Sequence, residues 1–205
     1  MNQNYKTNHS EKDLKDRLKK IRHVALDMDG TIYNGGTLFE YTNPFLNSLK
    51  KAGISYSFLT NNPSRSIPDY ISHLENMGVK AEASEIYTSA SATISYLKTE
   101  HPNKKKLFIL GTPSMIKEFE DAGFVSTNDD ADDVPDAVLV AFDTTLEYSR
   151  LCRAAWWISE GLFYVATNPD LVCPTDERTI LPDCGSICAA LEKATNRKPD
   201  ITLGK

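Results

Sequence analysis

The sequence predicts an α/β protein whose strands form a largely parallel sheet with helices on its faces. Two observations lead to this fold class. Short apolar runs of the length of buried strands alternate with longer segments in which apolar residues recur at helical spacing. Glycines follow directly on several of the helical segments, where a helix end favours a residue that tolerates a left-handed backbone. Alternation of strands and helices is typical of parallel sheets.

Each element follows from its local pattern. Short runs rich in β-branched and aromatic residues predict strands, and apolar residues three or four apart predict helices. Gly53, Gly78 and Gly123 end three of the helices, and Asn34-Gly35-Gly36 predicts a mobile turn. The predicted strands are 21–26, 54–59, 86–88, 107–110, 137–142 and 163–166, and the predicted helices are 10–20, 44–52, 64–77, 89–98, 113–122, 146–159 and 186–196.

The composition is that of an ordinary soluble globular protein. With 205 residues, 40% hydrophobic and 25% charged, the chain can form one large domain or two small ones. The net charge of -5 gives no reason to expect nucleic acid or an anionic membrane as a partner. No apolar run is long enough to span a membrane and the N-terminus lacks a signal-peptide core, so we expect a cytoplasmic location.

The four cysteines are expected to be structural. Cys152, Cys173, Cys184 and Cys188 form no Cys-x-x-Cys pair, and no histidine stands at zinc-site spacing from them. Cys184 and Cys188 are four residues apart and can share one face of a helix as two half-buried thiols.

Two carboxylates follow the apolar run 24–26. Asp27 and Asp29 come where ligands collect in α/β proteins, at the carboxyl end of a strand. Two anions this close resist ionising together unless a cation lies between them, and Mg²⁺ is usually held by one or two carboxylates plus phosphate oxygens. One acid can then act as nucleophile while the other transfers protons. A solvated turn explains Asp-x-Asp-Gly about equally well.

A second polar group follows the next strand. Thr60, Asn61 and Asn62 lead from its carboxyl end into a predicted helix, where hydroxyl, amide and backbone N–H groups can cradle phosphate oxygens. Taken alone, an ordinary helix cap is the better explanation. The acidic pair on the neighbouring strand shifts the balance towards a phosphate site. Lys205 can place a cation at this phosphate site. The alternative interpretation of Lys205 is that it belongs to an exposed tail.

In this order and spacing, these motifs resemble the haloacid dehalogenase-like (HAD) phosphohydrolases. The similarity is greatest to the subgroup with a large cap, which includes NagD-like sugar phosphatases, 4-nitrophenyl phosphatases and phosphoglycolate phosphatases. The matching stretches are Asp27-Met28-Asp29-Gly30-Thr31, Leu59-Thr60-Asn61-Asn62-Pro63-Ser64-Arg65, Tyr87-Thr88-Ser89-Ala90, Ile109-Leu110-Gly111-Thr112-Pro113, Ala166-Thr167-Asn168-Pro169-Asp170, Gly185-Ser186-Ile187 and Gly204-Lys205.

The resemblance implies a Rossmann-like three-layer core with an inserted α/β cap. We therefore expect a first core segment at 1–80, the cap domain at 81–177 and a second, incomplete core segment at 178–205. It also implies a Mg²⁺-dependent phosphomonoester hydrolase acting on a small phosphorylated metabolite. The cap would close over the site and select the leaving group.

The resemblance further assigns roles to individual residues. Asp27 would attack phosphorus, Asp29 would protonate the leaving oxygen and then activate water, and Lys205 would neutralise charge. Asp27 and the Asp29 backbone carbonyl would hold Mg²⁺. The residues implied in substrate binding are Thr60, Asn61 and Asn62, together with Thr167, Asn168 and Asp170 near the predicted return to the core.

The chain departs from the family pattern in two places. A fourth signature, with further acidic residues that would supply the remaining metal ligand, does not follow Lys205, so we expect a truncated chain of reduced activity. Pro182-Asp183-Cys184-Gly185 stands where relatives commonly have Pro-Gly-x-Gly, which puts the local loop geometry in question.

Three further expectations concern function and assembly. A phosphoacceptor signalling domain has similar residues, but such domains are smaller and lack a large insertion between the threonine and the lysine. A non-catalytic phosphate-ester-binding or scaffold protein is the other alternative. Trp156-Trp157 lies in a helical pattern in which only one ring can face the core, so we expect the other to pack on a neighbouring domain or subunit, the latter as a homodimer through the cap.

Overall fold

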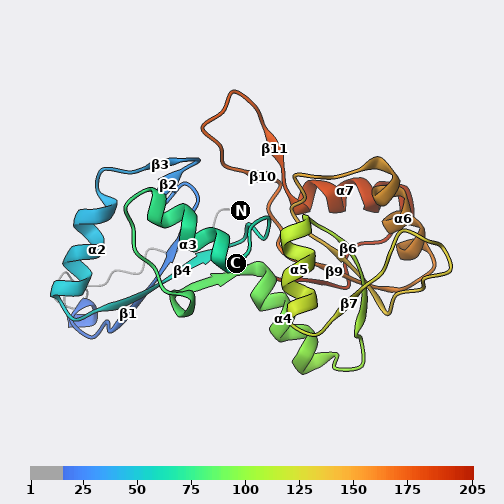
Figure 1. Cartoon of the computed structure of the whole chain (residues 1–205), viewed down its shortest axis with the longest axis horizontal. Helices are drawn as coiled ribbons and strands as arrows, with labels where there is room; N and C mark the ends of the chain where they lie inside the picture. The colour runs from blue at the N-terminus through green and yellow to red at the C-terminus, as the bar shows by residue number, and fades with distance from the viewer. Residues whose placement is uncertain (1–15) are drawn as a thin grey trace, which may run out of the picture.

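The computed structural model describes residues 16–205, which form two α/β units side by side (Figure 1). The first unit, residues 16–88, contains a three-stranded parallel sheet in the order β1-β4-β5. The second unit, residues 89–205, contains a five-stranded parallel sheet in the order β12-β9-β8-β6-β7. The predicted α/β class with parallel sheets is therefore confirmed. The predicted helix 10–20 lies largely outside the described residues.

The first unit buries one face of its sheet. Strands β1 (His23–Asp27), β4 (Ser55–Thr60) and β5 (Ile86–Thr88) are in register so that Asp27 pairs with Leu59 and Thr60 with Thr88. Helices α2 (Thr42–Lys51) and α3 (Ile67–Asn76) contribute side chains to a single apolar cluster with β1 and β4. The fully buried members of this cluster that join helix to strand are Phe58, Tyr70 and Leu74.

The second unit has three layers. Its strands are β6 (Lys106–Leu110), β7 (Val125–Ser126), β8 (Ala137–Val140), β9 (Phe163–Ala166) and β12 (Ile201–Thr202). Helices α6 (Tyr148–Ser159) and α7 (Cys184–Thr195) pack on one face, and α4 (Ser89–Glu100) and α5 (Pro113–Asp121) on the other. Alternate residues of β6 point to opposite faces, so Phe108 joins one core and Leu107 the other.

The sheets divide the chain differently from the predicted domain boundaries. A break at residue 80 would place β5 in the cap, but β5 pairs with β4 in the first sheet. A return to the core at residue 178 would place α7 and β12 in the first unit. Instead β12 pairs with β9, and Ile187 and Leu191 of α7 are buried in the core of the second unit. Local pattern could not assign these elements because each pairing joins residues far apart in sequence.

Two short antiparallel ribbons and a helical turn were not predicted. The hairpin β2 (Tyr33–Asn34) and β3 (Thr37–Leu38) forms around the predicted turn. The ribbon β10 (Val172–Cys173) and β11 (Leu181–Pro182) carries a loop that projects from the second unit (Figure 1). The loop approaches the hairpin where the Gly36 N–H donates to Asp176 Oδ2 at 3.4 Å. A 3₁₀ turn, η1 (Ala83–Glu85), precedes β5.

The tryptophans and cysteines follow the helical pattern that the sequence indicated. Trp157 is 3% exposed and Trp156 is 40% exposed, so one ring faces the core and the other faces outwards. A homodimer through the Trp156 surface stays a prediction. Cys184 and Cys188 are buried thiols with their sulfurs 3.9 Å apart. No helix within residues 16–205 is long and apolar enough to cross a membrane.

Candidate active site

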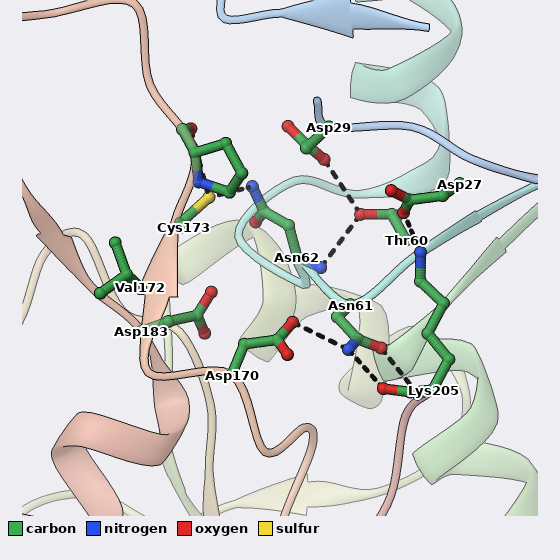
Figure 2. A pocket seen from close by; sticks show the side chains of 11 residues that line it. Asp27, Asp29, Thr60, Asn61, Asn62, Asp170, Val172, Cys173, Asp183 and Lys205 are labelled. Atoms are coloured by element: carbon green, nitrogen blue, oxygen red, sulfur yellow. Dashed lines mark hydrogen bonds and ion pairs between the residues drawn. The ribbon is translucent and has the colours of Figure 1, made fainter. Parts of the chain in front are cut away.

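A cavity of about 420 Å³ opens between the two units, at the carboxyl ends of β1 and β4. Lys205, the last residue, lines this cavity, and Figure 1 marks the C-terminus between the two units. Its lining, shown in Figure 2, is predominantly polar and combines side chains of both units: Asp27, Asp29, Thr60, Asn61, Asn62, Asp170, Val172, Cys173, Pro174, Asp183 and Lys205. The structure thus brings together seven of the nine predicted site residues.

Asp27 is the last residue of β1 and carries two fixed contacts. Its Oδ2 accepts a hydrogen bond from Thr31 Oγ1 at 2.8 Å, and its Oδ1 forms an ion pair with Lys205 Nζ. The Asp27 side chain remains 43% exposed, so the carboxylate is held in place yet accessible from the cavity. A positioned, accessible carboxylate beside a cation has the geometry of a nucleophile.

Asp29 lies in a different environment from Asp27. The chain turns sharply after Met28, with Gly30 in a left-handed conformation at φ 77°, and this turn brings Asp29 to the edge of the cavity. Thr60 Oγ1 donates to Asp29 Oδ2 at 3.2 Å. Burial raises the pKa of Asp29, while the Thr60 hydrogen bond and the Arg65 charge oppose the shift. Two neighbouring carboxylates with different environments suit different roles in proton and phosphoryl transfer.

The loop after β4 is built by its own side chains. Thr60 Oγ1 accepts from the Asn62 N–H at 3.0 Å. The Asn62 side-chain oxygen accepts from the N–H and the hydroxyl of Ser64, at 3.0 and 2.6 Å, and the Asn62 carbonyl accepts from Tyr70 at 2.7 Å. The amide of Asn62, predicted to bind substrate, therefore shapes the loop, although the residue does line the cavity.

Asn61 connects the loop to the second unit. Its Nδ2 donates to Asp170 Oδ2 at 2.8 Å and to the Lys205 carbonyl at 3.0 Å, and its Oδ1 accepts from the Lys205 N–H at 2.9 Å. Asn61 thereby clamps the backbone of Lys205, and the lysine Nζ also donates to the Leu59 carbonyl at 3.2 Å. Lys205 is thus held against Asp27. It does not form the free exposed tail that the sequence offered as an alternative.

The remaining predicted substrate-binding residues separate into two groups. Thr167 and Asn168 are fully buried and do not line the cavity. Thr167 Oγ1 donates to Asn168 Oδ1 at 3.0 Å, and Asn168 Nδ2 donates to Asp183 Oδ1 at 3.1 Å. Both residues therefore support the site from behind, which corrects their predicted contact with substrate. Asp170 does line the cavity, and its contact with substrate stays a prediction.

Asp183 is a cavity residue that sequence reasoning missed. It is the N-cap of α7, 2% exposed, and its Oδ1 accepts from the Cys184 N–H at 2.5 Å. The available signal was an aspartate, a common N-cap, three residues before the predicted helix 186–196, because α7 begins two residues earlier than predicted. The local geometry also requires Gly185, because a Cβ there would lie 2.4 Å from the Pro169 carbonyl oxygen. The departure at 182–185 therefore forms an ordered helix start.

A second cavity of about 360 Å³ adjoins the first and shares Asp29, Asn62, Cys173 and Pro174 with it. It lies under the β10–β11 loop and beside the β2–β3 hairpin. Its further polar and charged lining residues include Arg65, His73, Thr144, Thr175, Asp176 and Glu177. A molecule held at Asp27 could extend past Asp29 into this space.

The donor set at Asp27 and Asp29 fits a hard divalent cation that also binds substrate and water. Within residues 16–205, no three His, Cys, Asp or Glu side chains gather in a metal-holding arrangement, so the donors do not form a closed structural site. Mg²⁺ commonly takes one or two carboxylates and completes its shell with water and phosphate oxygens. Asp27 and the Asp29 backbone would hold such an ion.

Comparisons with known proteins agree on one family. The sequence model of a protein family described as haloacid dehalogenase-like hydrolase matches residues 24–125. Ribonucleotide monophosphatase NagD of Escherichia coli K12 is 32% identical over 179 residues, which cover 87% of this chain and 68% of NagD. A 4-nitrophenylphosphatase from Thermotoga maritima superposes with a TM-score of 0.82 at 39% identity, over 92% of this chain and 69% of that one. A glycerol phosphate phosphatase from Mycobacterium tuberculosis, solved with magnesium, has a TM-score of 0.79 at 31% identity, over 89% and 55%.

Proposed function

Because the chain belongs to the haloacid dehalogenase-like hydrolases, we propose that it hydrolyses phosphomonoesters of small metabolites through an aspartyl-phosphate at Asp27. The observation that carries the proposal is the cavity in which the Asp27–Lys205 ion pair, Asp29 and Thr60 meet. Phosphoryl transfer depends mainly on positioning and charge stabilisation, and this arrangement supplies both. The phosphatase names of the relatives support the same reaction class.

In the first step, an Asp27 carboxylate oxygen attacks phosphorus while the bond between phosphorus and the leaving oxygen breaks. Asp29 gives its proton to that oxygen, and burial, which raises the pKa of Asp29, favours the protonated acid needed here. Thr60 donates to a phosphate oxygen, and the Lys205 ammonium offsets the negative charge that gathers around Asp27.

In the second step, water attacks phosphorus and the bond to Asp27 breaks. Asp29, now a carboxylate, takes a proton from that water, which returns both acids to their starting states. Inorganic phosphate then leaves. A bound divalent cation, supported by the magnesium complex of one relative, would supply charge neutralisation between the phosphate and the two acids.

The adjoining cavity is the space for the leaving group. Its hydroxyl, imidazole, guanidinium and carboxylate groups favour a polar leaving group rather than a long apolar one. Closure of the β10–β11 loop against the β2–β3 hairpin, where Gly36 meets Asp176, would exclude water from this space. The identity of the ester is an experimental question that a panel of sugar, polyol and aryl phosphates addresses.

The test is phosphate release from that panel by the 205-residue chain, with and without Mg²⁺, beside Asp27→Asn. We expect Mg²⁺-dependent release and a loss of at least roughly a thousandfold in the variant, whose side chain keeps its shape but cannot form the acyl-phosphate. Tight binding of an ester without turnover would instead support a non-catalytic binding protein. Equal turnover by wild type and Asp27→Asn would overturn the mechanism.

A further inference from the structure

Tyr33 carries a buried hydroxyl that the mechanism above leaves unused. The residue is 1% exposed, and its hydroxyl has no hydrogen-bond partner among the residues that the structure describes. Buried hydroxyl groups without a partner are uncommon and destabilising, so each one calls for an explanation. Tyr33 lies only four residues after Asp29, on the strand that follows the catalytic turn.

The turn places Tyr33 beside Asp29. The Gly30 N–H donates to the Tyr33 carbonyl at 2.8 Å, and the Met28 carbonyl accepts from Ile32 at 2.9 Å, so the chain folds back on itself. The Tyr33 ring packs edge-on against His73 with centroids 5.1 Å apart. Asp29 and Tyr33 also pair in an isolated β-bridge, and Asp29 lines the same cavity as His73, so the Tyr33 side chain lies on the side of the turn that carries the Asp29 carboxyl group.

Thr60 creates the need for a second donor. A threonine hydroxyl has one proton to donate, and in this structure Thr60 donates it to Asp29 Oδ2 at 3.2 Å. In the proposed reaction the same proton is given to a phosphate oxygen. Asp29 then loses the only side-chain hydrogen bond that it makes among the described residues, at the moment when its orientation matters most.

We propose that Tyr33 is a positioning residue that donates its hydroxyl proton to Asp29 once Thr60 has turned to the phosphate. The inference rests on the proposed function, in which Asp29 protonates the leaving oxygen. A protonated carboxyl group has one oxygen that carries the proton and one that accepts. With Tyr33 held on the accepting oxygen, the acidic proton lies on the other oxygen, which faces the leaving group. Asp29 keeps this hydrogen bond after it has given up its proton.

The test compares two leaving groups in Tyr33→Phe. An alkoxide leaves only with a proton from Asp29, whereas 4-nitrophenolate leaves readily without one, so the variant should affect the two esters differently. We expect kcat for the alkyl phosphate that the wild type hydrolyses fastest to fall roughly tenfold, and kcat for 4-nitrophenyl phosphate to change less than about twofold. Damage to the fold would lower both rates alike.

Tyr164→Phe is the matched control. Tyr164 is also fully buried, and its hydroxyl has no hydrogen-bond partner within residues 16–205, but it lies on β9 in the core of the second unit. Its variant should leave the ratio of the two rates unchanged. Equal losses on both esters in Tyr33→Phe, or no loss on either, would overturn the role of Tyr33. A wild type that hydrolyses neither ester would overturn the proposed function, and the role of Tyr33 with it.

Discussion

Substitution of Gly204 by alanine should remove Lys205 from the site. Gly204 has a left-handed backbone, with φ 84°. A Cβ at this position would lie 2.7 Å from Asn61 Oδ1, 3.0 Å from the Thr167 carbonyl oxygen and 3.1 Å from the Cβ of Asn168. None of these neighbours can yield easily, because Asn61 is fixed by its own hydrogen bonds and the other two contacts belong to buried residues.

The size of the effect follows from these contacts. A residue with a side chain costs about 1–2 kcal/mol in the left-handed region. Relief of the 2.7 Å contact also separates Asn61 from the Lys205 backbone, which breaks hydrogen bonds of 2.9 and 3.0 Å that are each worth about 0.5–1.5 kcal/mol. The sum, roughly 2–5 kcal/mol, exceeds the free energy that a partly exposed Asp27–Lys205 ion pair can supply.

The assay is kcat/KM for the best ester of the panel, measured for Gly204→Ala, Lys205→Met and the double variant. We expect a loss of roughly 30- to 5,000-fold in Gly204→Ala, in proportion to the free energy above. If both changes act through the same ammonium group, the double variant should be no worse than Lys205→Met alone. Gly204→Ala with the wild-type kcat/KM would refute the view that Gly204 and Asn61 place Lys205.

Two further predictions concern buried titratable groups. Burial, together with the charge of Asp69, raises the pKa of Glu118 from 4.5 to about 7, and its Oε2 has no hydrogen-bond partner among the described residues. The stability that its neutral form contributes is present below pH 4.5 and is lost as the pH rises through about 7. Glu118→Gln should therefore stabilise the protein by roughly 1–3 kcal/mol above pH ~8 and by little below pH ~4.5. The check is the denaturation midpoint of the variant and of the wild type at each pH. A difference between the two proteins that is the same at both pH values would contradict this prediction. Burial, followed by the charge of Asp29, raises the pKa of Cys173 to about 12. Iodoacetamide near pH ~8 should therefore label the exposed Cys152 well before Cys173, as measured by peptide mapping. The reverse order of labelling would contradict this and show that the Cys173 thiol is accessible from the cavity.

The sequence allowed prediction of the features that depend on local pattern, which are the ends of strands and the polar residues that follow them. Asp27, Asp29 and Thr60 could be found because each stands where a buried strand ends, and parallel strands bring such ends to one edge of a sheet. The assignment of β5 and β12 to their sheets failed because it depends on pairing partners far along the chain. The clamp of Asn61 on Lys205 joins residues 144 positions apart in the sequence, so local pattern could not predict it either.

Several predicted binding residues proved to have structural contacts. Asn62 bonds to its own loop, and Thr167 and Asn168 are buried behind the cavity. A polar residue near a site looks the same in sequence whether it faces a ligand or a neighbouring backbone, because amides and hydroxyls serve both purposes. The cytoplasmic location, the lack of nucleic-acid or membrane partners and the homodimer stay predictions.

The most direct test of the proposed mechanism is to look for the phosphoryl group on Asp27. The chain is mixed with its best ester in Mg²⁺, quenched in acid within one turnover, and digested for mass spectrometry. We expect a phosphorylated peptide that contains Asp27, that disappears as phosphate is released and that is absent in Asp27→Asn. Rapid phosphate release with no covalent phosphopeptide at any time, or with the phosphoryl group on another residue, would contradict it.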